Sequence, residues 1–188
     1  MLGGESNLFD IGGGVPQGSP LSVVLLILYN SELFNICRRL RASILGVGFT
    51  DDLIVLAYST TTRANCIKLE ELHKDCLSWA KRYGIKFAPD KYELVHFTRA
   101  RKRFDLSASV QLGNGIVKEP TKEVRVLGVI LDSKLQWSAH ARYLRDKAAI
   151  QLGGLSRIAA STWGPSFIKA RQVYQAVVRP SFTYASAI

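Results

Sequence analysis

Two adjacent carboxylates, Asp51 and Asp52, are the residues of this chain best suited to catalytic chemistry. They stand between two apolar runs, in the stretch Gly46-Val47-Gly48-Phe49-Thr50-Asp51-Asp52-Leu53-Ile54-Val55. Successive side chains of a strand point to opposite faces, so the pair serves one site only at a hairpin tip or bend, which Gly46 and Gly48 favour. Carboxylate oxygens suit Mg²⁺, and paired ions recur in phosphoryl displacement. The alternative is a solvated turn, in which Asp is common.

A glycine-rich loop lies upstream, in Gly12-Gly13-Gly14-Val15-Pro16-Gln17-Gly18-Ser19-Pro20. Ser19 is a favourable N-cap and Pro20 a favourable first helical residue, which predicts a helix from about Ser19 to Arg41. The unpaired N–H groups of a helix N-terminus suit a phosphate or a base edge, and glycines allow close approach. An ordinary loop before a capped helix is the simpler explanation of this segment taken alone.

Together the two segments resemble a reverse transcriptase, most closely the enzymes of non-LTR retrotransposons. In that family the glycine-rich segment lies beside the nucleotide and template, and the aromatic-x-Asp-Asp stretch is the metal-binding hairpin of the palm. Trp79–Lys91 is similar to the next palm motif. Val126–Asp132, with Trp137 and His140, is similar to the primer-gripping hairpin and the start of the thumb. The pattern continues through Leu155–Tyr184, so the resemblance covers nearly the whole chain.

The resemblance implies transfer of a nucleotidyl group from a dNTP to a DNA primer 3′-hydroxyl, with RNA as template. Asp51 and Asp52 would hold Mg²⁺, or alternatively Mn²⁺, and Lys91 would approach the outgoing pyrophosphate. The other implied contacts are with the nucleotide and template, by Pro16, Gln17, Gly18 and Ser19, and with the primer, by Leu127 and Gly128.

The implied fold is α+β, with a partial right-hand polymerase palm (antiparallel sheet with packed helices) over residues 1–137 and a mostly helical thumb-like segment over 138–188. The family's palm also has an earlier strand with another metal-binding aspartate, and Asp10 lies too close to the glycine loop to be that residue. We therefore expect a segment that needs upstream fingers and palm from the same polyprotein. A catalytically dead nucleic-acid-binding remnant, an unfolded relic and an intron-encoded maturase are the alternatives.

Periodicity predicts the elements that position these residues. Apolar residues at steps of three and four predict an amphipathic helix from about Arg63 to Tyr83, with Trp79 in the core. Tyr92–Phe97 and Val124–Leu131 each read as a strand, and Gly113-Asn114-Gly115 marks a tight turn. From Ser138 onward the sequence predicts three helices, broken at Gly153-Gly154 and at Gly164-Pro165.

The net charge of +10 is unevenly distributed: residues 1–62 carry 3 basic and 5 acidic side chains, and residues 63–188 carry 22 and 10. A polyanion such as nucleic acid is the natural partner of this excess, and an acidic membrane surface is the weaker alternative. The run Arg99-Ala100-Arg101-Lys102-Arg103 suits template phosphates, a nuclear-import signal or a charged surface turn. Primer or template backbone is the expected partner of Arg125, Lys134, Arg142, Arg145 and Lys147.

No membrane partner is expected, because the longest strongly apolar run, Val23–Tyr29, is far shorter than the roughly 20 residues of a membrane span. Three cysteines without a Cys-x-x-Cys pair indicate reduced thiols of an intracellular protein. We expect the protein to be nuclear if it is expressed. The dispersed histidines indicate no structural metal.

Overall fold

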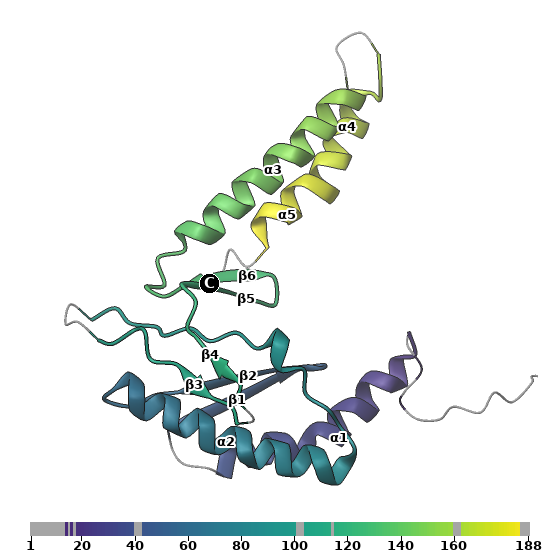
Figure 1. The fold of residues 1–188 in the computed structure, drawn as a ribbon. Helices are drawn as coiled ribbons and strands as arrows, with labels where there is room; N and C mark the ends of the chain where they lie inside the picture. Colours follow the sequence, from purple (N-terminus) through teal and green to yellow (C-terminus); the bar gives the residue numbers. More distant parts are fainter. Residues whose placement is uncertain are drawn as a thin grey trace, which may run out of the picture. The chain divides into compact units, whose positions relative to one another are not determined.

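The computed structural model describes residues 14, 16, 18–39, 43–100, 104–113, 115–159 and 163–184. They form helices and small two-stranded sheets, which is the α+β class that the sequence predicts (Figure 1). The chain divides into two compact units, residues 1–90 with 110–117 and residues 91–109 with 118–188. The division into a palm up to residue 137 and a thumb from 138 stays a prediction.

The first unit begins with helix α1 (Pro20–Arg39), which starts directly after Ser19 as predicted. The antiparallel hairpin of β1 (Ile44–Phe49) and β2 (Asp52–Ala57) follows. Helix α2 (Thr62–Tyr83) confirms the predicted amphipathic helix. The Thr61 hydroxyl accepts a hydrogen bond from the Ala64 N–H at 3.2 Å, and Gly84, with φ of 70°, ends the helix, so α2 is capped at both ends.

Six buried residues of α1 and α2 form the core of this unit: Leu33, Cys37, Leu72, Cys76, Trp79 and Ala80. Trp79 is 2% exposed, which confirms its predicted place in the core. Ile44, Leu53 and Val55 pack against this cluster from one face of the hairpin, so both helices cover the same face of β1 and β2 (Figure 1).

The prediction that Gly46 and Gly48 bend the hairpin is wrong. Neither has a positive φ, and each pairs in register across the hairpin, with Val55 and with Leu53. A Cβ on Gly46 would lie 2.5 Å from the Cys37 Cβ, and a Cβ on Gly48 would lie 2.1 Å from the Phe34 ring. The glycines instead let β1 pack closely against α1.

The opposite face of the hairpin and one side of α1 are apolar and exposed. On α1, Leu21 is 62%, Val24 52%, Leu25 44% and Leu28 64% exposed, and their spacing places them on one helix face. The apolar stretch is longer than the predicted run Val23–Tyr29, since by length and composition alone Pro20–Arg38 could cross a membrane. The same helix supplies Leu33 and Cys37 to the core, as a core helix of a globular domain does.

A short sheet pairs β3 (Val110–Gln111) with β4 (Val117–Lys118). Gly113 and Gly115 have φ of 82° and 76° between the strands, and Leu112 N–H donates to Ile116 O at 2.9 Å. The predicted tight turn is therefore confirmed, although Asn114 lies outside the described residues. The 3₁₀ turn η1 (Pro89–Lys91) precedes this region in the chain.

Two strand predictions in the second unit are wrong. Val124–Leu131 is a hairpin of β5 (Glu123–Val126) and β6 (Val129–Asp132), joined by a turn at Leu127 and Gly128. In Tyr92–Phe97, the described ladder pairing is one bridge, between Leu94 and Pro120. Its alternating pattern reflects partial burial without a ladder.

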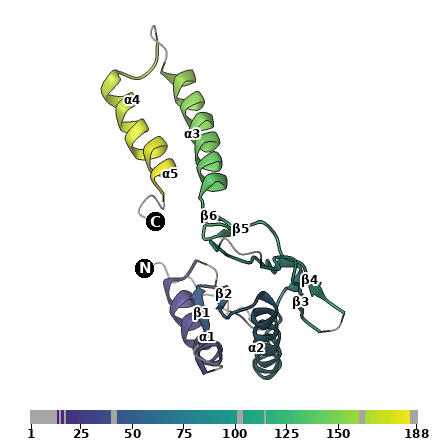
Figure 2. The same cartoon turned by 90° about the vertical axis from the view of Figure 1, so that its left-hand side faces the viewer.

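The helices of the second unit form two arms that lie side by side (Figure 2). Helix α3 (Ser138–Ile158) passes through Gly153 and Gly154, so the predicted break there is wrong. The predicted break at Gly164-Pro165 is confirmed, and α4 (Phe167–Val173) starts after it. A π-helical turn η2 (Tyr174–Val178) joins α4 to α5 (Arg179–Thr183), just before Pro180, which cannot donate a backbone hydrogen bond.

Candidate active site and nucleic-acid interface

The Asp51-Asp52 pair lies at the tip of the β1–β2 hairpin. Phe49 pairs with Asp52, which leaves Thr50 and Asp51 as a two-residue turn. Thr50 has a φ of 55°, an uncommon conformation for a β-branched residue. Both carboxylates are exposed. The expectation that the pair stands at a hairpin tip is thus confirmed, and two acidic side chains project from one turn.

The turn is directed toward the N-terminal end of α1. Along β1, Gly46 faces Cys37 and Gly48 faces Phe34, so the strand runs opposite to the helix. Continuing this direction leads the Asp51-Asp52 turn toward the end of α1 that the glycine loop precedes. The first unit therefore contains both predicted segments in a consistent orientation.

The residues before α1 form a hydrogen-bonded turn. Ser22 Oγ donates to Pro16 O at 2.6 Å, and Ser22 N–H donates to Ser19 O at 3.1 Å. Gly18 has a φ of 90°, which favours glycine, and a Cβ there would have no atom within 4 Å. Pro16 and Gly18 are exposed, and Gln17 lies outside the described residues.

The donor chemistry of the turn fits a hard divalent cation, because both side chains offer carboxylate oxygens. Within the described residues, no group of three or more His, Cys, Asp or Glu side chains could hold a metal ion. A Mg²⁺ site built on Asp51 and Asp52 would therefore need further oxygen ligands from substrate phosphates, water or another segment.

Lys91 is the last residue of η1 and is exposed. It belongs to the second unit, whereas Asp51 and Asp52 belong to the first. Leu127 and Gly128 also belong to the second unit. The predicted site residues thus form three local groups: those of the first unit, Lys91, and Leu127 with Gly128. The assembly of these groups into one centre stays a prediction.

The Leu127-Gly128 turn has two consecutive positive φ angles, 48° and 86°. Such a turn matches the twist of a two-residue hairpin. Tyr184 covers it: the Tyr184 hydroxyl donates to Leu127 O at 2.7 Å, and a Cβ on Gly128 would lie 3.4 Å from the Tyr184 ring. The contact spans 57 residues of sequence, so periodicity could not have revealed it.

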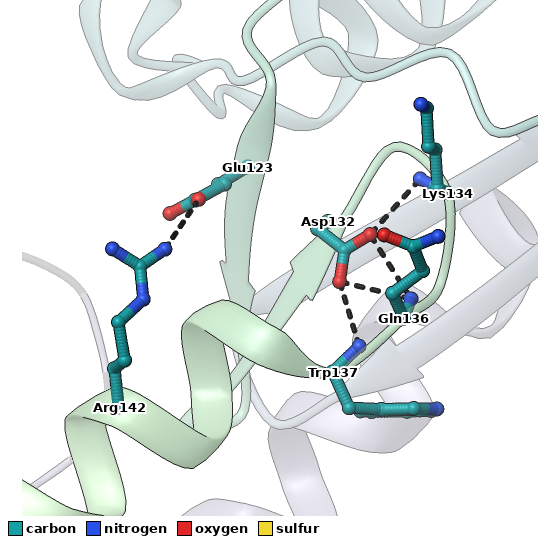
Figure 3. A network of polar contacts seen from close by, with 6 residues as sticks. All are labelled: Glu123, Asp132, Lys134, Gln136, Trp137 and Arg142. Carbon is teal, nitrogen blue, oxygen red and sulfur yellow. Dashed lines mark hydrogen bonds and ion pairs between the residues drawn. The ribbon is translucent and has the colours of Figure 1, made fainter.

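Asp132 fixes the loop between β6 and α3 (Figure 3). Its carboxylate accepts hydrogen bonds from the N–H groups of Lys134 and Gln136 at 3.0 Å and of Trp137 at 2.7 Å. The Gln136 N–H, and then those of Lys134 and Trp137, hold the pKa of Asp132 below its ordinary value. Leu135 and Trp137 have φ of 53° and 64°, so this carboxylate stabilises a loop of unusual backbone conformation. We call residues 132–137 the Asp132 loop.

His140 ties α3 to β6. It is 6% exposed, and its Nδ1 accepts a hydrogen bond from the Ile130 N–H at 3.3 Å. This hydrogen bond gives His140 a structural role in the first turn of α3. The sequence alone connected His140 only with the resemblance to reverse transcriptases. The Asp132 loop and His140 together fix where α3 starts relative to the β5–β6 hairpin.

Some of the basic side chains expected to meet nucleic acid have partners within the second unit. Arg142 lies 3.9 Å from Glu123, and Arg145 lies 3.0 Å from Asp146. The Arg125 guanidinium lies 5.3 Å and the Lys147 ammonium 6.0 Å from the Tyr143 ring centroid. All these charges stay exposed, so such contacts are weak and leave the positive surface open to a polyanion.

Comparison with known proteins gives a family match over most of the chain. The family of reverse transcriptases (RNA-dependent DNA polymerases) matches residues 4–131. The RNA-directed DNA polymerase from mobile element jockey of Drosophila funebris is 26% identical over 186 residues, covering 97% of this chain and 20% of that protein. A probable RNA-directed DNA polymerase from transposon X-element of Drosophila melanogaster is 24% identical over 179 residues, covering 95% and 19%.

A third relative is the retrovirus-related Pol polyprotein from type-1 retrotransposable element R1 4 of Nasonia vitripennis, 31% identical over 130 residues, covering 66% of this chain and 31% of that protein. No solved structure matches. The chain spans about a fifth of the length of the first two relatives.

Proposed function

Because the chain belongs to the reverse transcriptase family, we propose that it is the palm and thumb portion of a retrotransposon RNA-directed DNA polymerase. The reaction is nucleotidyl transfer from a dNTP to a DNA primer 3′-hydroxyl, templated by RNA. The observation that carries this proposal is the tight turn that places Asp51 and Asp52 together at an exposed hairpin tip. Two carboxylates at the tip suit a site that a primer end and a triphosphate must both reach.

Asp51 and Asp52 would hold Mg²⁺, or Mn²⁺, through their carboxylate oxygens. The ions, when bound, neutralise charge that develops on the attacking and leaving oxygens. The hairpin holds Asp51 in its turn and Asp52 at the first position of β2, so the backbone of both residues is fixed before substrate arrives, which lowers the cost of assembling the site. The positive φ of the neighbouring Thr50 supports this role, since uncommon φ angles cluster at functional sites.

The remaining roles follow the three local groups. Pro16, Gln17, Gly18 and Ser19 would border the nucleotide and the templating base, where Gly18 lets backbone approach closely. Lys91 would neutralise or protonate the outgoing pyrophosphate. Leu127, which is 41% exposed, and Gly128 would contact the primer through the turn that Tyr184 supports.

We further propose that catalysis needs a polypeptide segment beyond these 188 residues. Two carboxylates alone leave a two-metal site short of protein ligands. The exposed apolar faces of α1 and of the β1–β2 hairpin offer a surface that such a segment would cover. The second candidate function is nucleic-acid binding without catalysis, which the basic surface of residues 63–188 favours.

A chimera tests the proposal most directly. The chain replaces the matching segment of the Drosophila funebris jockey polymerase, and the purified chimera extends a DNA primer on an RNA template with Mg²⁺ or Mn²⁺. We expect extension, and we expect Asp51→Asn with Asp52→Asn to reduce it to background because the carboxylate charge is lost while the shape remains. Asp75→Asn, an exposed carboxylate of α2, is the matched control and should retain extension.

Full extension by the Asp51, Asp52 variant would refute the assignment of the metal site. A chimera that binds primer and template but never extends would favour the binding-only function. The isolated chain is assayed in parallel, and extension by it alone would refute the requirement for a further segment.

A further inference from the structure

A pocket in the second unit contains none of the residues proposed above for the metal, for the nucleotide or for the Leu127-Gly128 contact with the primer. It does contain Arg99 and Lys134, for which the sequence predicts only contact with a nucleic-acid backbone. Its volume is about 490 Å³, within the range of small-ligand pockets. One side is lined by Thr98, Arg99, Ala100, Phe104 and Leu106, and the other by Lys134, Leu135 and Gln136 of the Asp132 loop. All of these belong to the second unit, so the pocket is a feature of that unit alone.

The two sides of the pocket are joined by hydrogen bonds. Thr98 N–H donates to Ser133 O at 3.0 Å, and the Arg99 guanidinium donates to Leu135 O at 3.2 Å. Asp132 holds the far side by its contacts with the loop N–H groups (Figure 3). These hydrogen bonds connect the described parts of the two sides in the absence of a ligand, which lowers the entropic cost of binding.

The charge of the lining is positive. Arg99 and Lys134 are both exposed, and none of the described lining residues is acidic. The two nearby carboxylates are engaged elsewhere: Asp105 accepts hydrogen bonds from the Ser107 N–H and hydroxyl, and Asp132 accepts from the loop backbone. In Figure 3 the Lys134 side chain extends away from the Asp132 carboxylate, so the Lys134 ammonium group forms no ion pair with that carboxylate there.

Phe104 and Leu106 give the pocket an apolar part beside the polar Thr98 and Gln136. Phe104 is 39% and Leu106 37% exposed. An aromatic face beside two cations suits a ligand that has both a planar apolar part and an anionic part. A nucleotide has this combination, because its base stacks on aromatic side chains and its phosphate pairs with Arg and Lys.

We propose that this pocket binds one unpaired nucleotide of a nucleic-acid strand, with the phosphate on Arg99 and Lys134 and the base against Phe104. The inference rests on the proposed nucleic-acid function but concerns a site separate from the Asp51-Asp52 turn. An acidic peptide would pair with the two cations and leave the aromatic face unused. Such a contact positions a strand without reading its sequence, since stacking accepts every base.

The test measures binding of the full chain to a fluorescent single-stranded RNA of about 12 nucleotides by anisotropy over a range of salt concentrations. Arg99→Gln with Lys134→Gln should weaken binding about tenfold or more and reduce the slope of log affinity against log salt by about 1 to 2. The matched control, Arg157→Gln with Lys81→Gln, removes the same exposed charges from helices and should have a smaller effect.

The aromatic contact has its own variants. Phe104→Leu should weaken binding about tenfold, and Phe104→Tyr should restore it because the ring face is kept. Circular dichroism of each variant confirms that the fold is retained. A duplex of the same length, which has no unpaired base, should show no loss from Phe104→Leu.

Equal losses from the pocket pair and the control pair would overturn the proposal, as would equal affinity of the Leu and Tyr variants. Tighter binding of a polyglutamate peptide than of RNA would also overturn it. Normal RNA binding by all pocket variants, together with extension by the chimera, would remove this pocket and leave the polymerase assignment intact. RNA binding that depends on the pocket, together with a chimera that does not extend the primer, would support the pocket and count against the polymerase assignment.

Discussion

In the Asp51-Asp52 turn, Thr50 has an energetically unfavourable backbone conformation. A non-glycine residue in the left-handed region costs about 1–2 kcal/mol, and asparagine tolerates it better than a β-branched residue. With a Thr50 φ of 55°, we expect Thr50→Asn to raise the free energy of unfolding by about 1 kcal/mol. Urea denaturation measures this, with Thr60→Asn as control for an exposed threonine without a positive φ. An equal change in both variants would contradict the strain.

His73 gives the first unit a specific pH dependence. Burial lowers its pKa from the ordinary value of 6.5, against a smaller opposing effect of a hydrogen bond with the Leu112 backbone. Below that ordinary value the unfolded chain takes up a proton that the folded chain resists, so stability falls as pH drops below about 6.5 and stops falling below the lowered pKa.

We therefore expect unfolding midpoints in urea to fall between about pH 7.5 and 5.5 more in the unaltered chain than in His73→Gln. The other titrating groups are common to both proteins, so the difference between the two pH profiles isolates His73. Parallel profiles would show that His73 titrates alike in the folded and unfolded chains.

At the scale of elements, the packing of β1 on α1 depends on Gly46 and Gly48, which should differ in how well they tolerate an added side chain. A Cβ on Gly46 would lie 2.5 Å from the Cβ of Cys37, which is attached directly to the helix backbone. A Cβ on Gly48 would meet the end of the Phe34 ring, which can swing aside. We expect Gly46→Ala to destabilise the unit by about 2–3 kcal/mol and Gly48→Ala by less, as overpacking does.

Gly153→Ala is the opposite case and serves as control. This glycine lies inside α3 with nothing within 4 Å of its added Cβ, so alanine should stabilise by about 0.5–1 kcal/mol. Differential scanning calorimetry of the three variants gives the order. A stable Gly46→Ala variant would show that β1 and α1 are not closely packed.

Local signals predicted the elements whose ends are capped, and long-range contacts decided the others. The Ser19-Pro20 start of α1, α2 and the buried Trp79 followed from capping and periodicity. The pattern of Val124–Leu131 predicts one strand, but the chain turns at Leu127, which has a positive φ that leucine rarely adopts and which Tyr184 supports from 57 residues away. The Asp51-Asp52 turn was predictable because its two residues are adjacent; the pocket beside Phe104 was not, since its walls are distant in sequence.

At the scale of the whole molecule, the positive charge is concentrated in residues 63–188, whereas exposed apolar side chains occur in both parts of the chain and form one helix face on α1. Residues 1–62 have 3 basic and 5 acidic side chains and contain the exposed face of α1, whereas residues 63–188 have 22 and 10. Like charge repels between copies, but contiguous exposed apolar surface favours association. We expect the exposed face of α1, which lies in the part of the chain without a positive excess, to favour self-association, and residues 63–188 to govern binding to polyanions.

The exposed face of α1 provides the test of this division. Leu25 and Leu28 are 44% and 64% exposed and contribute nothing to the buried core, so Leu25→Gln with Leu28→Gln should reduce self-association with little change in unfolding free energy. Sedimentation velocity of the purified chain measures the association. Leu77→Gln with Leu152→Gln removes two leucines that are 40% and 45% exposed on other helices and should leave it unchanged. An equal reduction by both pairs would show that association follows total apolar exposure, and the face of α1 would then have no special part in it.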